Sequence, residues 1–159
     1  MTLASFLPLL RERELRSITN SYSEKGCRVN VAMDGVLLAT IGGSNYQRAN
    51  PSYQGKLADR IIFGDLRGNG FVCAVELKSG NLGHISDLKG QLQGALDLAA
   101  KLLEGIPVWD WYPVVLHGRR ISTTSLAAIN KARVSFRGTQ RRIITRRCGA
   151  SLTEILEAT

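Results

Sequence analysis

The sequence predicts an α/β domain in which helices flank a mixed β-sheet. Apolar residues recur at helical spacing, about 100° per residue, in two long segments, 7–24 and 84–105. Between and after them, short apolar or alternating runs bounded by Gly, Asn and Asp are typical of strands and turns. The resulting order is helix, two strands, two strands, helix, strand, short helix, two strands and helix, as in an α/β or α+β sandwich. The 159 residues suffice for one domain, residues 1–159, with a hydrophobic core.

The N-terminal third is predicted to contain one helix and two strands. Residues 7–24 predict an amphipathic helix that ends before Gly26. Its apolar stripe contains Leu7, Leu10, Leu15, Ile18 and Tyr22. Residues 27–41 predict two strands joined by a tight turn at Asp34-Gly35. Residues 42–56 are rich in Gly, Asn and Ser, so we expect a mobile loop that is long enough to be functional.

The middle of the chain predicts a β-hairpin followed by a helix of about five turns. Residues 57–63 and 71–79 read as the two strands, and residues 64–70 as the turn between them. The helix covers residues 84–105, and Pro107 prevents it from continuing. Its buried stripe is predicted to contain Leu88, Leu92, Ala95, Leu96, Ala99, Leu102 and Leu103.

The C-terminal part predicts a strand at 112–117 and a short helix or turn at 125–132. A hairpin with a turn at Gly138-Thr139 and a last helix form a basic C-terminal region, about 133–158. The last helix begins with Ser151 and Glu154, which have the spacing of a capping box.

The charge balance favours a polyanionic partner. Lys and Arg number 21 against 13 Asp and Glu, which gives a net charge of +8. Such an excess favours nucleic acid first and an acidic membrane surface second, and solubility alone is the alternative. No apolar run approaches the roughly 18 residues of a membrane span, and no basic residue precedes the apolar N-terminus as in a signal peptide.

The three cysteines predict neither a zinc site nor a disulfide framework. Cys27, Cys73 and Cys148 lie far apart, their number is odd, and no CxxC occurs. Cys73 lies in an apolar strand and reads as a small core residue. Free thiols predict a reducing compartment, and we therefore expect a cytoplasmic protein.

A carboxylate and an amine end the strand that looks most buried. Side chains alternate along a strand, so Glu76 and Lys78 share one face and Leu77 faces the other way. Asp59 lies in the preceding strand, and the hairpin brings it alongside. Two carboxylates beside each other suit Mg²⁺, and the backbone carbonyl of Leu77 could add a ligand. The alternative is an ordinary ion pair between Glu76 and Lys78 at the end of a sheet.

The same residues carry a resemblance to a known family. The segments "ADRIIF" and "VELKSG", joined by a hairpin and followed by a helix with "GQLQGAL", resemble the PD-(D/E)xK nuclease superfamily, which has the restriction-endonuclease-like fold. The resemblance covers a core of about residues 55–118. Ala58 stands where the family name places proline.

The resemblance implies a metal-dependent nuclease. Asp59 and Glu76 would hold Mg²⁺, for which Mn²⁺ can substitute. Lys78 would position water and stabilise the phosphate, and Gln91 would match a glutamine often found on the following helix. The buried stripe favours Gln91 over Gln93 for this place.

Other side chains have weaker signals for the same site. Glu14 is a candidate auxiliary acid, because family members often use a glutamate on the first helix, and a structural carboxylate is the alternative. Asp65 competes with Asp59 for the first acid, although it lies in the predicted turn. His84 and His117 lack metal-ligand spacing. Candidate contacts to nucleic acid are Lys56, Arg60, Arg141, Arg142, Arg146 and Arg147.

These observations predict a Mg²⁺-dependent nuclease that hydrolyses DNA phosphodiester bonds, most simply as an endonuclease. We expect a homodimer, because cutting a duplex needs two sites. RNA stays open as a substrate. The alternatives are a non-catalytic nucleic-acid-binding module and a protein-interaction subunit of a defence or mobile-element system.

Overall fold

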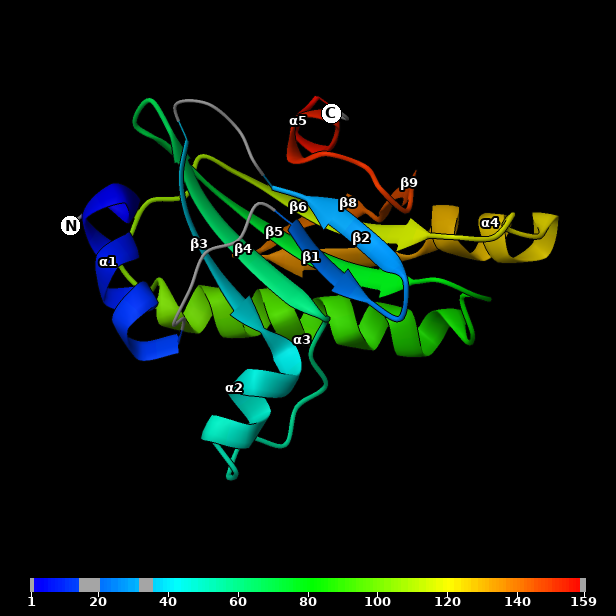
Figure 1. The fold of residues 1–159 in the computed structure, drawn as a ribbon, viewed down its shortest axis with the longest axis horizontal. Helices are drawn as coiled ribbons and strands as arrows, with labels where there is room; N and C mark the ends of the chain where they lie inside the picture. Colours follow the sequence, from blue (N-terminus) through cyan, green and yellow to red (C-terminus); the bar gives the residue numbers. More distant parts are fainter. Residues whose placement is uncertain (1, 15–20, 32–35, 158–159) are drawn as a thin grey trace.

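A five-stranded mixed sheet forms the centre of the molecule (Figure 1). The computed structural model describes residues 2–14, 21–31 and 36–157. The strand order is β3-β4-β5-β6-β9, in which β3, β4 and β5 are antiparallel and β6 and β9 run parallel to β5. The strands are β3 (Val36–Gly42), β4 (Arg60–Leu66), β5 (Asn69–Lys78), β6 (Asp110–His117) and β9 (Ile144–Arg147). The predicted α/β class with a mixed sheet and flanking helices is confirmed.

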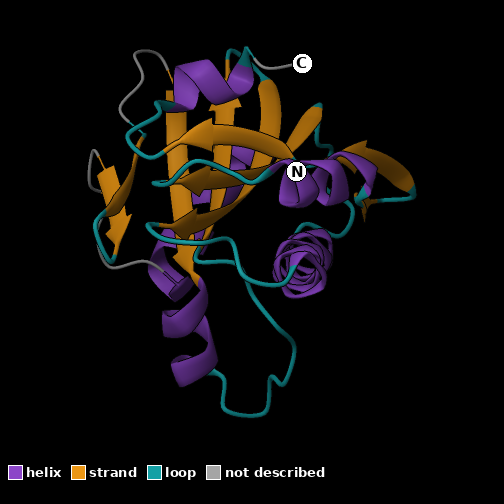
Figure 2. Cartoon of the chain, turned by 90° about the vertical axis from the view of Figure 1, so that its right-hand side faces the viewer, coloured by secondary structure: helices purple, strands orange, loops and turns teal. Residues whose placement is uncertain are grey.

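Helices α1 (Leu3–Glu14) and α3 (Ile85–Leu102) cover one face of this sheet (Figure 2). Helix α3 connects β5 to β6, as parallel neighbours require. Its buried side chains are Leu88, Leu92, Ala95, Leu96, Leu98 and Ala99. Leu103, just beyond the helix, is also buried, and Leu102 is half-buried. The predicted stripe is therefore confirmed except that Leu98 belongs to it and Leu102 lies at its edge.

A small hairpin and the last helix cover the other face. The hairpin consists of β1 (Ser21–Glu24) and β2 (Cys27–Asn30), and the helix is α5 (Leu152–Leu156). Even-numbered residues of β4 and odd-numbered residues of β5, such as Ile62 and Val75, point to this side. Ile61 and Ala74 point to the side of α3.

The predicted helix over residues 7–24 is wrong at both ends. Helix α1 begins at Leu3, and residues 21–24 form strand β1; the residues between 14 and 21 lie outside the described part. The hairpin turn falls on Lys25 and Gly26, whose φ values are 49° and 86°. Two consecutive positive φ values suit a two-residue hairpin turn, whose twist matches that of the strands. The turn therefore favours a strand at residues 21–24 over the helix that the apolar spacing predicts there.

Strands β2 and β3 exist as predicted but do not form a hairpin with each other. Strand β2 pairs with β1, whereas β3 pairs with β4. The expected turn at Asp34-Gly35 lies outside the described residues.

The predicted mobile loop at 42–56 is wrong in its first half, which is helix α2 (Gly43–Ala49). The helix is anchored where it begins, because the N–H of Gly43 donates to the carbonyl of Asp59 at 3.0 Å. A Cβ on Gly43 would lie 2.2 Å from the carbonyl oxygen of Ala58, so only glycine permits this approach. The Gly-rich composition of residues 42–56 suggests a loop, whereas Gly43 is required by a contact between distant parts of the chain.

The β4–β5 hairpin is confirmed, but its first strand begins at Arg60, so residues 57–59 of the predicted strand precede it, and the turn is shorter than expected. Strand β4 runs to Leu66, and Arg67 and Gly68 make the turn. Asp65 therefore lies in the strand, and its carboxylate accepts a hydrogen bond from the N–H of Gly68 at 2.8 Å.

At the C-terminus, helix α4 (Thr123–Lys131) is followed by a hairpin of β7 (Arg133–Phe136) and β8 (Thr139–Arg142). The turn falls on Arg137 and Gly138 rather than on Gly138-Thr139. Within the predicted C-terminal region of hairpin and helix, residues 144–147 form a further strand, β9, which belongs to the central sheet. The helix cap is confirmed, since Ser151 Oγ accepts a hydrogen bond from the N–H of Glu154 at 3.2 Å.

The prediction of three free cysteines is wrong. Cys27 on β2 and Cys148 after β9 form a disulfide across a sequence separation of 121 residues, and Cys73 alone is free and buried. Spacing in sequence says nothing about two cysteines that the fold brings together. The expectation of a reducing compartment rests on three free thiols, and two of these cysteines are oxidised in the structure. Among the described residues, no helix is long and apolar enough to cross a membrane.

Gly94 on α3 lets the segment before β4 lie against the helix, and we expect its substitution to be costly. A Cβ at this position would lie 1.8 Å from the backbone carbonyl oxygen of Lys56. Gly94→Ala should lower the free energy of unfolding by about 1–3 kcal/mol or more, because backbone must move. Gly90→Ala is the matched control: its Cβ would meet only the flexible Lys56 side chain, at 3.4 Å. It should stabilise by up to about 1 kcal/mol through helix propensity. Equal effects of both substitutions in urea unfolding would contradict this explanation.

Candidate metal and nucleic-acid site

Asp59 and Glu76 lie beside each other where the pairing of β4 with β5 ends. Arg60 and Val75 are the last residues paired between β4 and β5, so the β4-side edge of β5 beyond Val75 is not paired with β4, while the other edge continues to pair with β6. The Asp59 side chain fills this gap, and its Oδ2 accepts a hydrogen bond from the N–H of Leu77 at 2.8 Å. Asp59 and Glu76 share strand parity with Ile61 and Ala74, so both lie on the side of α3.

Glu76 is a buried acid, with 2% of its surface exposed. Among the described residues, its Oε2 has no hydrogen-bond partner. Burial first, and then the neighbouring Asp59 carboxyl, raise the pKa of Glu76 to about 9, while the positive charge of Lys78 acts in the opposite direction. A lone structural acid would be costly here. A cation between the two carboxylates would remove that cost.

Lys78 and Gln91 face the same hollow as Asp59 and Glu76. Lys78 is half-buried at the end of β5, two residues after Glu76 and on the same face. Gln91 comes from α3 and lines the same hollow as Asp59, Glu76 and Lys78. The expectation that Gln91 rather than Gln93 turns this way agrees with the geometry. Gln93 instead exchanges hydrogen bonds of 2.9 and 2.8 Å with the backbone of Ser135 on β7.

The carbonyl of Leu77 lies at the same edge of β5. The N–H and C=O of a strand residue point to the same side, and the N–H of Leu77 points to Asp59. This placement is compatible with the expected backbone ligand.

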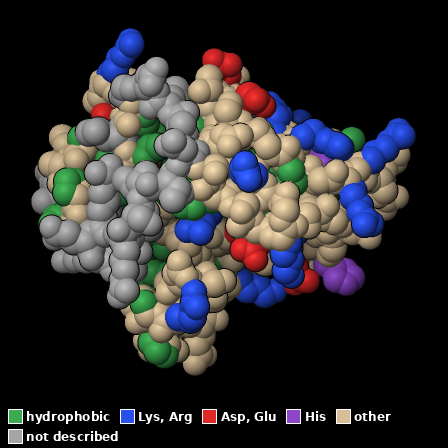
Figure 3. Space-filling view, in the orientation of Figure 1, with side chains coloured by type: hydrophobic (Ala, Val, Ile, Leu, Met, Phe, Trp, Pro, Cys, Tyr) green, Lys and Arg blue, Asp and Glu red, His purple; other side chains and the backbone are tan. Residues whose placement is uncertain are grey.

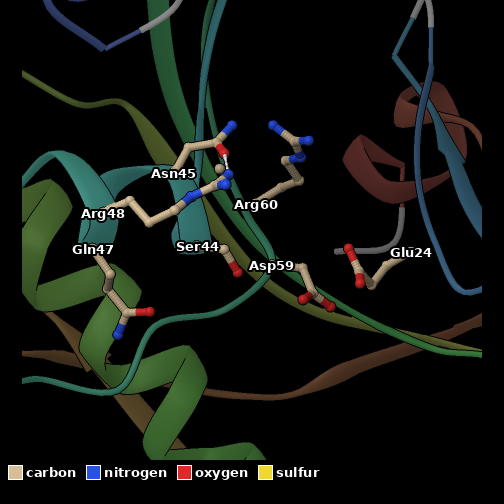
Figure 4. Close-up of a pocket in the computed structure, with 8 residues that line it drawn as sticks. Glu24, Ser44, Asn45, Gln47, Arg48, Asp59 and Arg60 are labelled. Atoms are coloured by element: carbon tan, nitrogen blue, oxygen red, sulfur yellow. Dashed lines mark hydrogen bonds between the residues drawn. The ribbon is translucent and has the colours of Figure 1, made fainter.

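Asp59 lies at the meeting point of three hollows. The acid hollow, about 330 Å³, is lined by Glu24, Lys25, Asp59, Glu76, Lys78 and Gln91, among others. The lysine hollow, about 640 Å³, includes Lys56, Asp59, Lys78, His84, Asp87 and Gln91. The arginine hollow, also about 640 Å³, includes Glu24, Asn45, Arg48, Asp59 and Arg60 (Figure 4). A chain-like substrate could therefore pass Asp59 on both sides.

Glu24 is a residue that sequence reasoning missed. It ends β1, is exposed, and lines both the acid hollow and the arginine hollow. Figure 4 shows its carboxylate close to that of Asp59 in this view. The available signal was "SYSEKGCRV", an alternating run around a Lys-Gly turn, which the helical interpretation of residues 7–24 obscured.

Two other acids do not join the site. Asp65 pairs in register with Gly70, at the opposite end of the hairpin from Glu76, so it does not replace Asp59. Glu14 ends α1, and its side chain lies outside the described part. No group of three His, Cys, Asp or Glu side chains placed to hold a metal ion occurs among the described residues. A cation here would have two carboxylates, with water and a backbone carbonyl completing its shell, which suits Mg²⁺.

The two histidines differ in position. His84 precedes α3, is exposed and lines the lysine hollow. His117 ends β6, and its Nδ1 lies 2.8 Å from the carbonyl oxygen of Arg119.

The candidate basic contacts divide into two groups. Lys56 and Arg60 border the hollows around Asp59, although Lys56 also pairs with Asp87 at 2.9 Å through exposed side chains. Arg141 forms an ion pair with Asp110 and lies over the ring of Trp111, so it serves the fold. None of Arg141, Arg142, Arg146 and Arg147 lines the three hollows.

The predicted basic rim from residues 141–147 is therefore split. Arg142 lies on β8, in a separate small sheet. Arg147 lies on β9 in register with His117, which is itself in register with Lys78. Arg147 is thus two strands, roughly 10 Å, from the backbone of Lys78. Only the β9 half of the rim is at the end of the sheet that carries the site.

Comparisons with known proteins found no match to a family model, to a curated protein or to a solved structure.

Proposed function

We propose that this protein is a Mg²⁺-dependent nuclease of the PD-(D/E)xK type that hydrolyses DNA phosphodiester bonds. One observation carries the proposal: Asp59, directly before β4, and Glu76 and Lys78, on the neighbouring β5, face a single hollow. An ordinary ion pair between Glu76 and Lys78 explains this less well, because no salt bridge joins them among the described residues. The buried Oε2 of Glu76 gains a partner only if a cation or a proton occupies the site.

Each residue has a definite task in this proposal. Asp59 and Glu76 hold Mg²⁺, which supplies polarisation of the phosphate and a more acidic bound water. Asp59 is oriented by the N–H of Leu77, so its second oxygen can face the hollow. The ammonium group of Lys78 stabilises the charge that accumulates on the phosphate. Gln91 helps to orient the water or the phosphate from the helix side.

The electrostatics support a polyanionic substrate. The net charge of +8 remains after the two salt bridges of the described residues are set aside. On the face shown in Figure 3, Lys and Arg side chains are spread widely, with fewer acidic side chains among them. A dispersed basic surface attracts a phosphate backbone without selecting a base sequence.

Cleavage assays test the proposal. Labelled single-stranded, duplex, flap and four-way DNA, with an RNA counterpart of each, should be incubated with Mg²⁺, Mn²⁺ or EDTA. We expect cleavage of at least one DNA substrate with either metal and none with EDTA. Cleavage that persists in EDTA, or intact substrates throughout at high enzyme concentration, would refute the proposal.

Lys78→Ala should separate chemistry from metal binding. We expect a fall in cleavage rate on the order of 100-fold or more, because a charge that stabilises the transition state is lost. Mg²⁺ affinity should stay the same or rise slightly, because a cation next to the carboxylates is removed. The measurement is single-turnover cleavage together with a metal titration. Unchanged cleavage by Lys78→Ala would assign Lys78 to the fold instead.

A further inference from the structure

The arginine hollow contains two guanidinium groups that form no salt bridge with an acid in the described part of the chain. Arg48 comes from α2 and Arg60 from the start of β4. Within the described ranges, the salt bridges are Lys56–Asp87 and Arg141–Asp110, so neither Arg48 nor Arg60 takes part in one. Two like charges facing one hollow repel each other unless an anion lies between them.

Neighbouring residues hold both guanidinium groups in place. The Arg60 guanidinium lies over the ring of Tyr22, 4.3 Å from its centre. An ideal Cβ on Gly42 would be 2.9 Å from Arg60 Nη1 and 3.2 Å from Asn45 Nδ2, so both groups occupy the space beside this glycine. Asn45 also accepts a hydrogen bond from Arg48 (Figure 4). Arg60 and Asn45, the hydrogen-bond partner of Arg48, thus both lie beside Gly42. The stacking on Tyr22 leaves edge N–H groups of Arg60 for a ligand.

The hollow has the chemistry of a site for a charged chain. Apart from Gly42, the other seven lining residues are polar or charged. Its acids are Glu24 and Asp59, which lie at the end that opens to the acid hollow. Helix α2 is fixed to this end through the hydrogen bond from Gly43 to the Asp59 carbonyl. The start of α2 therefore has a fixed position relative to Asp59.

We propose that Arg48 and Arg60 together bind one backbone phosphate of a nucleic-acid strand, adjacent to the phosphate that is cut at Asp59 and Glu76. The position of this phosphate next to the cleaved one rests on the proposed nuclease function. Binding of the phosphate by the two arginines can be tested without cleavage. Guanidinium groups suit this role, because their planar N–H pairs match two phosphate oxygens at once. Asn45 is a positioning residue that orients Arg48.

The binding test uses protein in which Glu76→Gln prevents cleavage, in EDTA. Affinity for a labelled oligonucleotide is measured between about 50 and 200 mM salt for this parent and for added Arg48→Ala, Arg60→Ala and the double change. The double change should reduce the slope of log affinity against log salt by about 0.7 for single strands or 0.9 for duplex, which is the value for one phosphate. An unchanged slope would overturn the proposal, and a loss twice as large would show two separate phosphates rather than one shared.

Arg67→Ala is the matched control. Arg67 is an exposed arginine in the turn at the other end of β4, about 20 Å along the strand from Arg60. It removes the same charge and should leave the slope within about 0.2 of the parent, because it contacts no phosphate of the bound strand. An equal loss from Arg67→Ala would mean that only net charge matters, which contradicts a defined phosphate site.

The two proposals can fail separately. If the parent shows no salt-dependent affinity for DNA or RNA, the phosphate site is refuted and a protein partner is the better interpretation of this surface. If protein with Glu76 intact cuts DNA while Arg48→Ala and Arg60→Ala leave the KM unchanged, the nuclease proposal stands and the phosphate site fails. Salt-dependent binding that both arginines support, without any cleavage in Mg²⁺, refutes the nuclease and retains the phosphate site.

Discussion

Glu76→Gln is expected to make the protein more stable and to abolish cleavage. The pKa of Glu76 is raised to about 9, so folding without metal requires this acid to take up a proton near neutral pH. Glutamine has the same shape and no charge. We expect it to raise the free energy of unfolding by roughly 2–4 kcal/mol near pH 7.5 in EDTA. Cleavage in Mg²⁺ should fall on the order of 1,000-fold, because one of two metal ligands is lost.

The stability gain should depend on pH in a defined direction. Below the unfolded-state pKa of about 4.5, Glu76 is protonated in both states and contributes no slope. Between about 4.5 and 9 the folded state holds one proton more than the unfolded state, so stability falls with rising pH by up to about 1.4 kcal/mol per unit. Glu76→Gln should remove this slope. The measurement is urea unfolding in EDTA across this range.

Glu104→Gln is the matched control, since Glu104 is an exposed acid just beyond α3. It should change stability by less than about 0.5 kcal/mol and leave the pH slope intact. If Glu76→Gln destabilises the protein at about pH 7.5, the buried carboxyl is a structural hydrogen-bonding group and the strained-acid explanation is wrong.

The disulfide between Cys27 and Cys148 should carry a large share of the stability. It closes a loop with a sequence separation of 121 residues and ties the β1–β2 hairpin to the end of β9. Replacing both cysteines by alanine is expected to lower the free energy of unfolding by about 3–5 kcal/mol. Reductant should lower the stability of the natural protein by a similar amount and leave the double variant unchanged.

Cys73→Ala serves as the control, because Cys73 is buried and free. This variant should respond to reductant as the natural protein does. Thiol titration in denaturant should detect one reactive thiol in the unreduced natural protein and three after reduction. Three thiols before reduction, or no effect of reductant on unfolding, would contradict a stabilising disulfide.

Local patterns predicted the parts of the fold that local forces determine. The β4–β5 hairpin and α3 follow from apolar spacing and turn residues, and the same spacing places Asp59, Glu76 and Gln91 on one side of the sheet. The sequence did not predict strand β1, because the apolar spacing of residues 7–24 fits a helix. Pairing with β2 and burial of Tyr22 favour a strand instead. Tertiary contacts outweigh intrinsic propensity in such short segments.

The contributions of α2 and of the hairpin to the site could not be read from the sequence. The glycine at position 43 looks like a loop residue until its contact with the Ala58 carbonyl is known. Glu24 and Arg48 approach Asp59 only because β1 and α2 meet at the start of β4, which no spacing in the chain reveals. The disulfide depends on the same kind of long-range proximity.

The most direct measurement is calorimetric titration of Mg²⁺ or Mn²⁺ into the natural protein, Asp59→Asn and Glu76→Gln, in two buffers of different ionisation enthalpy. If Asp59 and Glu76 share a cation, the natural protein binds it at one site near neutral pH and releases close to one proton, because Glu76 must ionise. Both variants then bind far more weakly, and Glu76→Gln releases no proton. Equal binding by all three proteins, or no binding by the natural protein, would contradict a shared metal site.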